Sequence, residues 1–405
     1  MDCVTIEKLA KEKCSGCGAC AQLCPVQCIL MKEDIEGFYY PVVDSAKCIS
    51  CGKCLKQCPQ YNVVPGNQGS SYYAVIHNNR EVLKTSTSGG AFSLFAKEIL
   101  EKGGVVYGCA MEKENDTFVV KHIRVDDFSG LEKLKGSKYV QSIIGNTFLE
   151  AKKDLEQNRM ILYSGTPCQI AGLKAFLQKD YSNLITCEVI CHGVPSQKLF
   201  QKNIAYLEQK GKFRILNFKF RSKAREWAMY WEYSHTAPKT GEKSEVLIAD
   251  KNPYYMAFLN GDCYRESCYL CSYAKKDRVA DITMGDYWGV EEFEPEFADP
   301  NGVSLVLLNN LKAENFFVSV KKEAKAKKVQ FSSASLYNKN LISPTVRSKR
   351  RDFAYRNLDM RVDELFDQYP YKISIKQRIK AHLKGIVSVR QKWEIKKFIK
   401  KLKKG

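Results

Sequence analysis

The sequence lacks a long hydrophobic run and an apolar leader. In 405 residues, no segment approaches the roughly 18 uncharged apolar residues of a membrane-spanning helix. The N-terminus, MDCVTIEKLAKEKC, has no apolar core of the kind that secretory signals carry. We therefore expect a cytoplasmic protein. Hydrophobic residues make up 44% and charged residues 27% of the chain, which is typical of a globular protein, and the length allows two or three domains.

Acidic residues are nearly missing from the C-terminal end. Residues 371–405 hold 13 basic residues and one acid, Glu394, whereas residues 1–66 hold seven of each sign. The last stretch, KWEIKKFIKKLKKG, spaces four apolar residues as one face of a helix: Ile395, Phe398, Ile399 and Leu402. This pattern predicts a basic amphipathic tail that docks on an anionic membrane surface or an acidic partner. No groove-reading module accompanies the charge, so we expect no nucleic-acid binding.

Cysteine is abundant, with 17 residues. A disulfide framework suits short secreted domains, and this chain has no visible export signal. The cysteines are also packed too closely for ordinary pairing, because several stand three positions apart. Metal ligation in a reducing compartment is the better interpretation.

The N-terminal cysteines form a doubled motif. CSGCGACAQLCP begins at Cys14 and CISCGKCLKQCP begins at Cys48. Cys-x2-Cys-x2-Cys-x3-Cys-Pro holds [4Fe–4S] clusters in bacterial ferredoxins, and the fourth cysteine of each run ligates the other cluster. We therefore assign one cluster to Cys14, Cys17, Cys20 and Cys58, and the other to Cys24, Cys48, Cys51 and Cys54. Zinc sites usually use two separate cysteine pairs, so zinc is the weaker alternative.

Two further features belong to this unit. The segment GFYYPVVD between the runs predicts a short hairpin. Cys28 and Cys3 are left over, and we interpret Cys28 as a packing residue. The linker VVPGNQGSS over residues 63–71 then marks a domain boundary.

After the linker, TSTSGGAFSLFAKEILEKGGVVYG predicts a loop, a helix and a strand. Ser88, Gly89 and Gly90 stand just before the helix, where free backbone N–H groups can bind an anion. An ordinary helix cap with a flexible lead-in would produce the same pattern.

Three later segments resemble strand-to-loop junctions that carry cysteines. They contain Cys168, then Cys191 with His192, then Cys263, Cys268 and Cys271. Thiols from three loops at one sheet end could converge on one metal centre. Buried, unliganded cysteine is common, and spacing alone leaves the choice open.

The order of motifs resembles a known family. SGG, KGSKYVQS, GTPCQ, CHGVPS, CYLC and ADITMGDYWG occur in this order over roughly residues 70–350. The chain is identified on these motifs as a member of the coenzyme F420 hydrogenase/dehydrogenase beta-subunit family, with a ferredoxin fused in front. The resemblance implies an α/β (α+β) fold with a 2[4Fe–4S] ferredoxin domain (1–65), a flavin-binding region (70–160) and a region that holds the third cluster and further FAD contacts (161–350). The basic tail (371–405) follows these regions.

The resemblance also implies cofactors and their ligands. It places a third [4Fe–4S] cluster on Cys168, Cys191, Cys268 and Cys271, and leaves Cys263 as a structural residue or second-choice ligand. It places FAD on nine residues: Ser88, Gly89, Gly90, Ser137, Lys138, Tyr139, Gln141, Thr166 and Asp286. No segment is assignable to the deazaflavin F420 itself.

These assignments predict an iron–sulfur flavoprotein oxidoreductase that takes electrons from an external ferredoxin. The electrons pass through the ferredoxin clusters and the third cluster to FAD and a small-molecule substrate, because flavin can couple one-electron carriers to two-electron chemistry. The alternatives are an electron-transfer subunit that serves a separate catalytic partner, and an F420-dependent dehydrogenase. No catalytic residue is assigned.

Two local interpretations stay open. Lys275, Lys276 and Arg278 could raise the potential of the third cluster, or could form a solvated turn. His192 could donate a proton to substrate, although a histidine that is merely hydrogen-bonded in a loop fits the sequence better.

Overall fold

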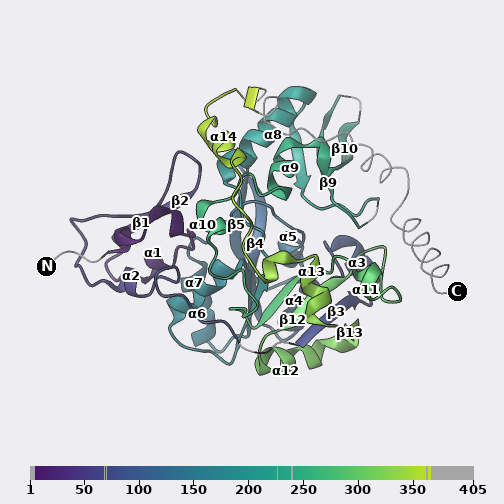
Figure 1. The fold of residues 1–405 in the computed structure, drawn as a ribbon, viewed down its shortest axis with the longest axis horizontal. Coiled ribbons are helices and arrows are strands. Elements are labelled where there is room, and N and C mark those ends of the chain that lie inside the picture. Colours follow the sequence, from purple (N-terminus) through teal and green to yellow (C-terminus); the bar gives the residue numbers. More distant parts are fainter. Residues whose placement is uncertain are drawn as a thin grey trace.

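The computed structural model describes residues 5–67, 69, 71–225, 227–238, 240–361 and 364–365. A small N-terminal unit lies beside a larger body built on one wide sheet (Figure 1). The basic tail over residues 371–405 lies outside the described residues, so its predicted helix stays a prediction.

The N-terminal unit consists of short elements between its cysteines. Its helices are α1 (Ala19–Leu23) and α2 (Lys53–Lys56), and the strands β1 (Ile29–Glu33) and β2 (Tyr39–Val43) form an antiparallel hairpin. The segment GFYYPVVD, predicted to be a hairpin by itself, supplies only the second strand, and the first strand precedes it. With so little regular structure, a small apolar core that includes several of the cysteines holds the unit together.

The body is organised around an eight-stranded mixed sheet in the order β13-β3-β12-β11-β7-β6-β4-β5. Its strands are β3 (Ser71–His77), β4 (Val105–Glu114), β5 (Thr117–Val125), β6 (Ile161–Gly165), β7 (Leu184–Val189), β11 (Ile282–Asp286), β12 (Ser304–Leu308) and β13 (Ala324–Lys328). β4, β6, β7 and β11 are mutually parallel, and β3 points the same way because β12 is antiparallel to both β11 and β3. Five strands therefore end at one edge of the sheet.

Helices cover both faces of this sheet. One face packs against α4 (Ala91–Glu101), α5 (Phe128–Leu134) and α12 (Leu311–Val320). The other packs against α6 (Thr147–Glu156) and α7 (Pro167–Leu177), with α3 (Arg80–Thr85), α11 (Val290–Phe293) and α13 (Phe331–Leu336) towards the β13 side. All five residues of β12 are buried, as expected for a strand with apolar layers on both sides.

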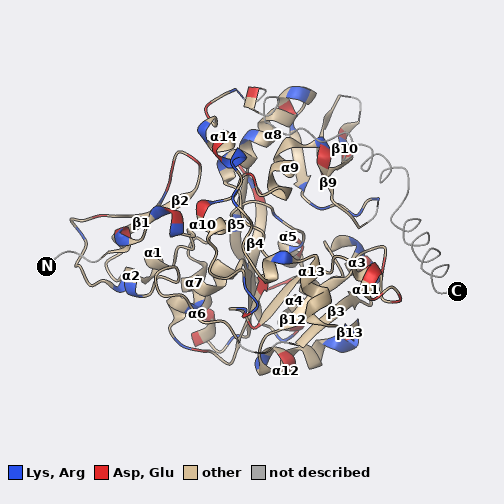
Figure 2. Cartoon of the chain, viewed as in Figure 1, with Lys and Arg blue, Asp and Glu red and all other residues tan. Residues whose placement is uncertain are grey.

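A second layer lies over the edge where the parallel strands end. It contains a three-stranded antiparallel sheet of β8 (Ile215–Lys219), β9 (Tyr230–Ala237) and β10 (Gly241–Ile248), with helices α8 (Gln197–Gly211) and α9 (Pro253–Leu259). An aromatic core joins these elements to the short helices α10 (Glu266–Tyr269) and α14 (Arg350–Arg356). Lys and Arg are grouped on β13 and α14 (Figure 2).

The predicted fold class is confirmed: a small ferredoxin-like region precedes a mixed α/β body. The predicted boundary between residues 160 and 161 falls inside the large sheet, since β3, β4 and β5 precede it and β6, β7, β11, β12 and β13 follow it. The two predicted regions therefore share one sheet. Within the described residues, no helix has the length and apolar character that a membrane span needs.

Candidate iron–sulfur and flavin sites

The first candidate site is a cavity on the inner side of the N-terminal unit. It has an empty volume of about 310 Å³, and Cys14, Cys17, Cys20 and Cys58 line it. These four thiols are the ones predicted to share a cluster, because the fourth cysteine of each run is expected to ligate the cluster of the other run. Gly16 (φ +66°) and Gly18 (φ +74°) let the backbone turn around the cavity, in a conformation that favours glycine. We call this cavity the inner site.

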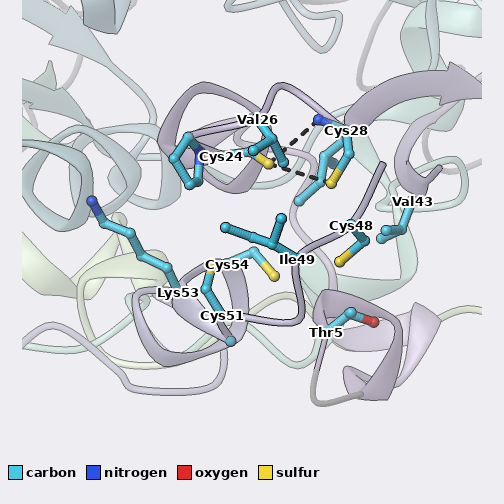
Figure 3. Close-up of a pocket in the computed structure, with 13 residues that line it drawn as sticks. Thr5, Cys24, Val26, Cys28, Val43, Cys48, Ile49, Cys51, Lys53 and Cys54 are labelled. Carbon is cyan, nitrogen blue, oxygen red and sulfur yellow. Dashed lines mark hydrogen bonds between the residues drawn. The ribbon is translucent and has the colours of Figure 1, made fainter. Parts of the chain in front are cut away.

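The second cavity lies on the outer side of the unit, with an empty volume of about 340 Å³. Cys24, Cys48, Cys51 and Cys54 line it, again in the predicted grouping (Figure 3). We call it the outer site. Cys28 also lines this cavity, and its Sγ is 3.4 Å from Sγ of Cys24. The interpretation of Cys28 as a packing residue is incomplete, because its buried thiol borders the site.

The third candidate site brings together four thiols from three loops of the body. Cys168 lies in the first turn of α7 after β6, Cys191 follows β7, Cys268 lies on α10, and Cys271 follows that helix. Burial raises the pKa of the Cys191 thiol well above its usual value, and the nearby Cys268, Cys168 and Cys271 thiols add to the rise. The four side chains are therefore close enough to repel one another as thiolates. We call them the four-thiol site.

The spacing of these thiols bears on the type of metal centre. Among the described residues, no three His, Cys, Asp or Glu side chains are arranged to hold one metal ion. A single zinc ion draws its thiolates in to about 2.3 Å, whereas a cubane spreads its four ligands over separate iron atoms. A soft, all-thiol donor set is of the kind that holds iron–sulfur clusters or zinc.

A buried ion pair holds two of the cysteine loops together. Glu188 of β7, close before Cys191, pairs with Arg278, which follows Cys271, and both side chains are almost fully buried. Glu188 also accepts hydrogen bonds from Thr283 Oγ1 at 3.0 Å and from the backbone N–H of Ala280 at 3.3 Å. Because the charge of Arg278 is paired with Glu188, this arginine is less suited to raising a cluster potential than its sequence position suggests. Of its neighbours, Lys276 is exposed and Lys275 is half-buried.

The inner site lies against α7, the helix that carries Cys168 of the four-thiol site in its first turn. A side chain placed on Gly172 of α7 would meet Cβ and Sγ of Cys17 at 3.0 Å, so α1 and α7 touch without a gap. Tyr273, two residues after Cys271, donates a hydrogen bond from its hydroxyl to the carbonyl of Pro59 at 2.5 Å. Burial raises the pKa of Cys17 to about 12, and Cys168 across the interface contributes to that rise. The outer site lies on the opposite side of the unit, where Cys51 is exposed.

The glycine-rich loop lies at the edge where the parallel strands end. Gly90 caps α4 with φ +83°, and the side chain of Ser88 donates to the carbonyl of Val303 at 2.7 Å. Ser137 donates from its backbone N–H to Thr87 Oγ1 at 3.1 Å, so the two predicted flavin segments meet. A Cβ on Gly90 would come within 2.9 Å of Cβ of His77. The glycine is therefore required by packing inside the protein, whatever binds outside.

A second group of predicted flavin residues surrounds Arg221. Its Nη1 donates to Asp286 Oδ2 at 2.8 Å and to the hydroxyl of Tyr139 at 3.3 Å, while its buried Nη2 has no partner among the described residues. Trp227 donates to the other carboxylate oxygen of Asp286 at 3.1 Å. The rings of Trp227 and Trp288 stack with centroids 4.9 Å apart. Arg221 therefore keeps one buried donor available for an acceptor group such as those of a flavin.

Lys223 links the two groups. Its ammonium donates to the carbonyls of Leu83 and Ser88, each at 2.7 Å, and these hydrogen bonds fix the glycine-rich loop to the segment after β8. Burial lowers the pKa of Lys223 to about 7. Neither Arg221 nor Lys223 is among the residues that the sequence predicts for the site. The only sequence signal is the run of basic residues, RSKAR, after a strand.

The remaining predicted residues are more dispersed. Lys138 donates to three carbonyls at the end of α5, and burial lowers its pKa to about 8. Gln141 donates to the carbonyl of Ser15 at 2.9 Å, so it lies at the boundary with the N-terminal unit. Thr166 caps α7, with Oγ1 3.2 Å from Sγ of Cys168. These three residues extend from the flavin loop to the cysteines.

Two residues with open roles are also placed. Cys263 is fully buried in the aromatic core, which suits a structural role. His192 is exposed, and desolvation by the surrounding protein lowers its pKa although the carboxylate of Asp286 opposes this. The neutral form of His192 is therefore favoured.

The chain matches known families in two parts, one in the N-terminal unit and one in the body. Residues 158–333 match the family described as the C terminus of the coenzyme F420 hydrogenase/dehydrogenase beta subunit. Residues 13–62 and 40–87 each match a family described as 4Fe-4S dicluster domain. No curated protein matches the chain.

One solved structure with a related chain is the xenon-derivatised F420-reducing NiFe hydrogenase complex from Methanosarcina barkeri. The similarity has a TM-score of 0.43 and 14% identity, and covers 75% of this chain and 91% of that one. Similarity at this level carries no functional information.

Proposed function

Since residues 158–333 belong to the coenzyme F420 hydrogenase/dehydrogenase beta-subunit family and an iron–sulfur dicluster domain precedes them, we propose that the chain is an iron–sulfur flavoprotein oxidoreductase. In this proposal the outer, inner and four-thiol sites each hold a [4Fe–4S] cluster, and the groups around Ser88 and Arg221 hold FAD. The clusters supply one-electron carriers, and the flavin couples them to the two-electron reduction of a small molecule.

The observation that carries the proposal is the order of the sites. The outer site faces solvent at Cys51, and Cys17 of the inner site packs against α7, which carries Cys168. Thr166, 3.2 Å from Sγ of Cys168, lies between the four-thiol site and the proposed flavin residues. An external donor can therefore approach at the outer site while the substrate approaches the opposite end. A ferredoxin is the donor that we propose, and the basic tail is a second docking element for it or for a membrane surface.

The tail can be tested separately from the cofactors. A chain truncated before Lys392 should keep its iron and flavin but sediment less with anionic vesicles, since each surface lysine is attracted by about 1 kcal/mol. Equal sedimentation of both chains would rule out membrane docking. In that case, an unchanged Michaelis constant for reduced ferredoxin after truncation would rule out partner docking as well.

The flavin assignment is tested by what the purified protein releases. Denatured protein should release FAD, and reduced ferredoxin should bleach the bound flavin in the anaerobic holoprotein. Lys223→Gln should lower flavin occupancy severalfold with iron unchanged. The reason is that the variant loses the two hydrogen bonds from Lys223 to the carbonyls of Leu83 and Ser88, which hold the glycine-rich loop. Lys219→Gln removes an exposed cation of β8, outside the glycine-rich loop's contacts, and should have no effect. Full flavin occupancy in the Lys223 variant would contradict the placement.

Enzyme and electron-transfer subunit are separated by turnover. The enzyme proposal requires that the isolated chain, supplied with reduced ferredoxin, reduces a substrate by itself. Flavin bleaching without turnover of any candidate substrate, and turnover restored by a second protein, would favour the subunit. Reduction of F420 by the isolated chain would favour the F420-dependent alternative.

A further inference from the structure

Arg265 lies at the junction between the N-terminal unit and the body, just before α10, the helix that carries Cys268. Its side chain is 1% exposed. Nε donates to the carbonyl of Cys14 at 2.6 Å, and Nη2 donates to the carbonyl of Tyr39 at 3.0 Å. Nη1 donates to the amide oxygen of Gln141 at 3.1 Å. A guanidinium from the body is therefore bonded to the backbone of an inner-site cysteine.

This cation differs from the other buried arginines of the described residues. Arg221 pairs with Asp286, Arg278 with Glu188, and Arg351 with Glu36. Within the described ranges, Arg265 has no carboxylate partner: its acceptors are two carbonyls and an amide. The flanking rings of Tyr40, at 4.0 Å, and Phe38, at 5.3 Å, are also neutral.

Such an arrangement is costly unless negative charge is supplied from elsewhere. Removing a cation from water is unfavourable, and a neutral hydrogen-bond shell recovers only part of the lost hydration free energy. The faces of the two aromatic rings attract the cation but carry no net charge. The contacts of Arg265 satisfy its donors but leave its charge uncompensated.

Two candidate sources of negative charge lie on either side of it. Arg265 bonds to the inner-site residue Cys14 and precedes the four-thiol residue Cys268 by three positions. The backbone N–H of Cys268 also donates to the carbonyl of Arg265 at 2.9 Å, so the arginine is hydrogen-bonded to a cysteine of each site. A cubane with four thiolate ligands carries a net negative charge, which increases on reduction.

We propose that Arg265 is the shared counter-ion of the inner site and the four-thiol site, and that it raises the reduction potential of both. The inference rests on the proposed function, since it assumes that both sites hold clusters. Added negative charge is stabilised by a nearby cation, most strongly where water is excluded. The outer site lies on the far side of the unit, so its potential is expected to be insensitive to this residue. By raising these two potentials and not the outer one, Arg265 favours electron transfer from the outer site to the body.

The test is an anaerobic potentiometric titration of the full-length holoprotein, followed by electron paramagnetic resonance, with iron content measured on each sample. In Arg265→Gln, two of three reduction steps should move to lower potential while the third stays. We expect at least a tenfold fall in the ratio of reduced to oxidised cluster at fixed potential, which equals about 59 mV for one electron. Arg265→Lys keeps the charge and should stay close to wild type. Lys276→Gln removes an exposed cation from the loop after Cys271 and should change nothing.

Several results would overturn the inference. Unshifted steps in a fully iron-loaded Arg265→Gln protein would do so, as would an equal shift of all three steps. If Arg265→Gln does not assemble its clusters, Arg265→Lys decides: a tenfold shift there, with full iron, contradicts a role for the charge. A wild-type protein with eight iron atoms and two steps would refute the proposed third cluster instead, and the inner-site step alone would then test Arg265.

Discussion

The N-terminal unit and the body build their thiol sites in different ways. In the N-terminal unit, nine cysteines between Cys14 and Cys58, Cys28 among them, line two cavities, with the short helices α1 and α2 and one hairpin as part of the scaffold. In the body, four cysteines spread from Cys168 to Cys271 meet only because β6, β7 and the segment before β11 reach the same edge of the sheet. The first arrangement is encoded locally, whereas the second depends on the tertiary fold. Damage to the sheet should therefore affect the two regions unequally.

The largest expected effect comes from breaking the ion pair under the four-thiol site. Glu188→Gln leaves the buried Arg278 without a carboxylate, which should lower the free energy of unfolding by about 3 to 5 kcal/mol. The four-thiol site should lose its iron while the N-terminal unit keeps about eight iron atoms. Iron analysis and chemical unfolding of anaerobic protein measure both effects.

The matched control is Glu81→Gln, which breaks the exposed pair of Glu81 with Lys84. Exposed pairs contribute little, so the change should stay within about 0.5 kcal/mol. Retention of all iron in Glu188→Gln would show that the four-thiol site does not depend on this scaffold.

A smaller effect is expected at the contact between the two regions. A leucine at Gly172 would overlap Cys17, which lies 3.0 Å from the position of the new Cβ. Overpacking of this kind costs about 1 to 3 kcal/mol, and here it should separate α1 from α7 rather than unfold either region. Proteolysis in the linker over residues 63–71 should become severalfold faster, with a weaker effect in Gly172→Ala. Unchanged proteolysis in both variants would mean that the contact does not hold the regions together.

The smallest effect is expected from the fifth thiol of the outer site. Cys24 is the fourth cysteine of the Cys-x2-Cys-x2-Cys-x3-Cys-Pro run, which ligates the other cluster, whereas Cys28 lies outside the run. The motif therefore favours Cys24 as the ligand. Cys28→Ser should therefore keep its iron, while Cys24→Ser should lose the outer cluster. The reverse result would exchange their roles.

The same comparison explains what the sequence could predict. The doubled motif predicts two groups of four thiols, and the same two groups line the two cavities. This prediction is possible because the cysteines are close in the chain and their spacing restricts their geometry. The helix after the glycine-rich loop also begins at Ala91, where its apolar spacing starts. The role of all these residues as ligands stays a prediction. Short sequence motifs therefore predict the local structure around them.

Contacts between residues far apart in the chain could not be predicted from the sequence. Arg221 reaches Asp286, Lys223 reaches Ser88, and Arg265 reaches Cys14, each across a long stretch of chain. Buried charges are placed by tertiary packing, so no spacing rule anticipates them. Gly90 shows the same limit, since His77 of β3 leaves no room for a Cβ at this position.

The most direct test of the central claim is the iron content of anaerobically prepared Cys168→Ala, compared with wild type and with Cys187→Ala. Cys187 is a fully buried core thiol of β7 outside the four-thiol site, so it controls for the loss of any buried cysteine. We predict about twelve iron atoms in wild type and in Cys187→Ala, and about eight in Cys168→Ala. Eight iron atoms in all three proteins would contradict a cluster at the four-thiol site.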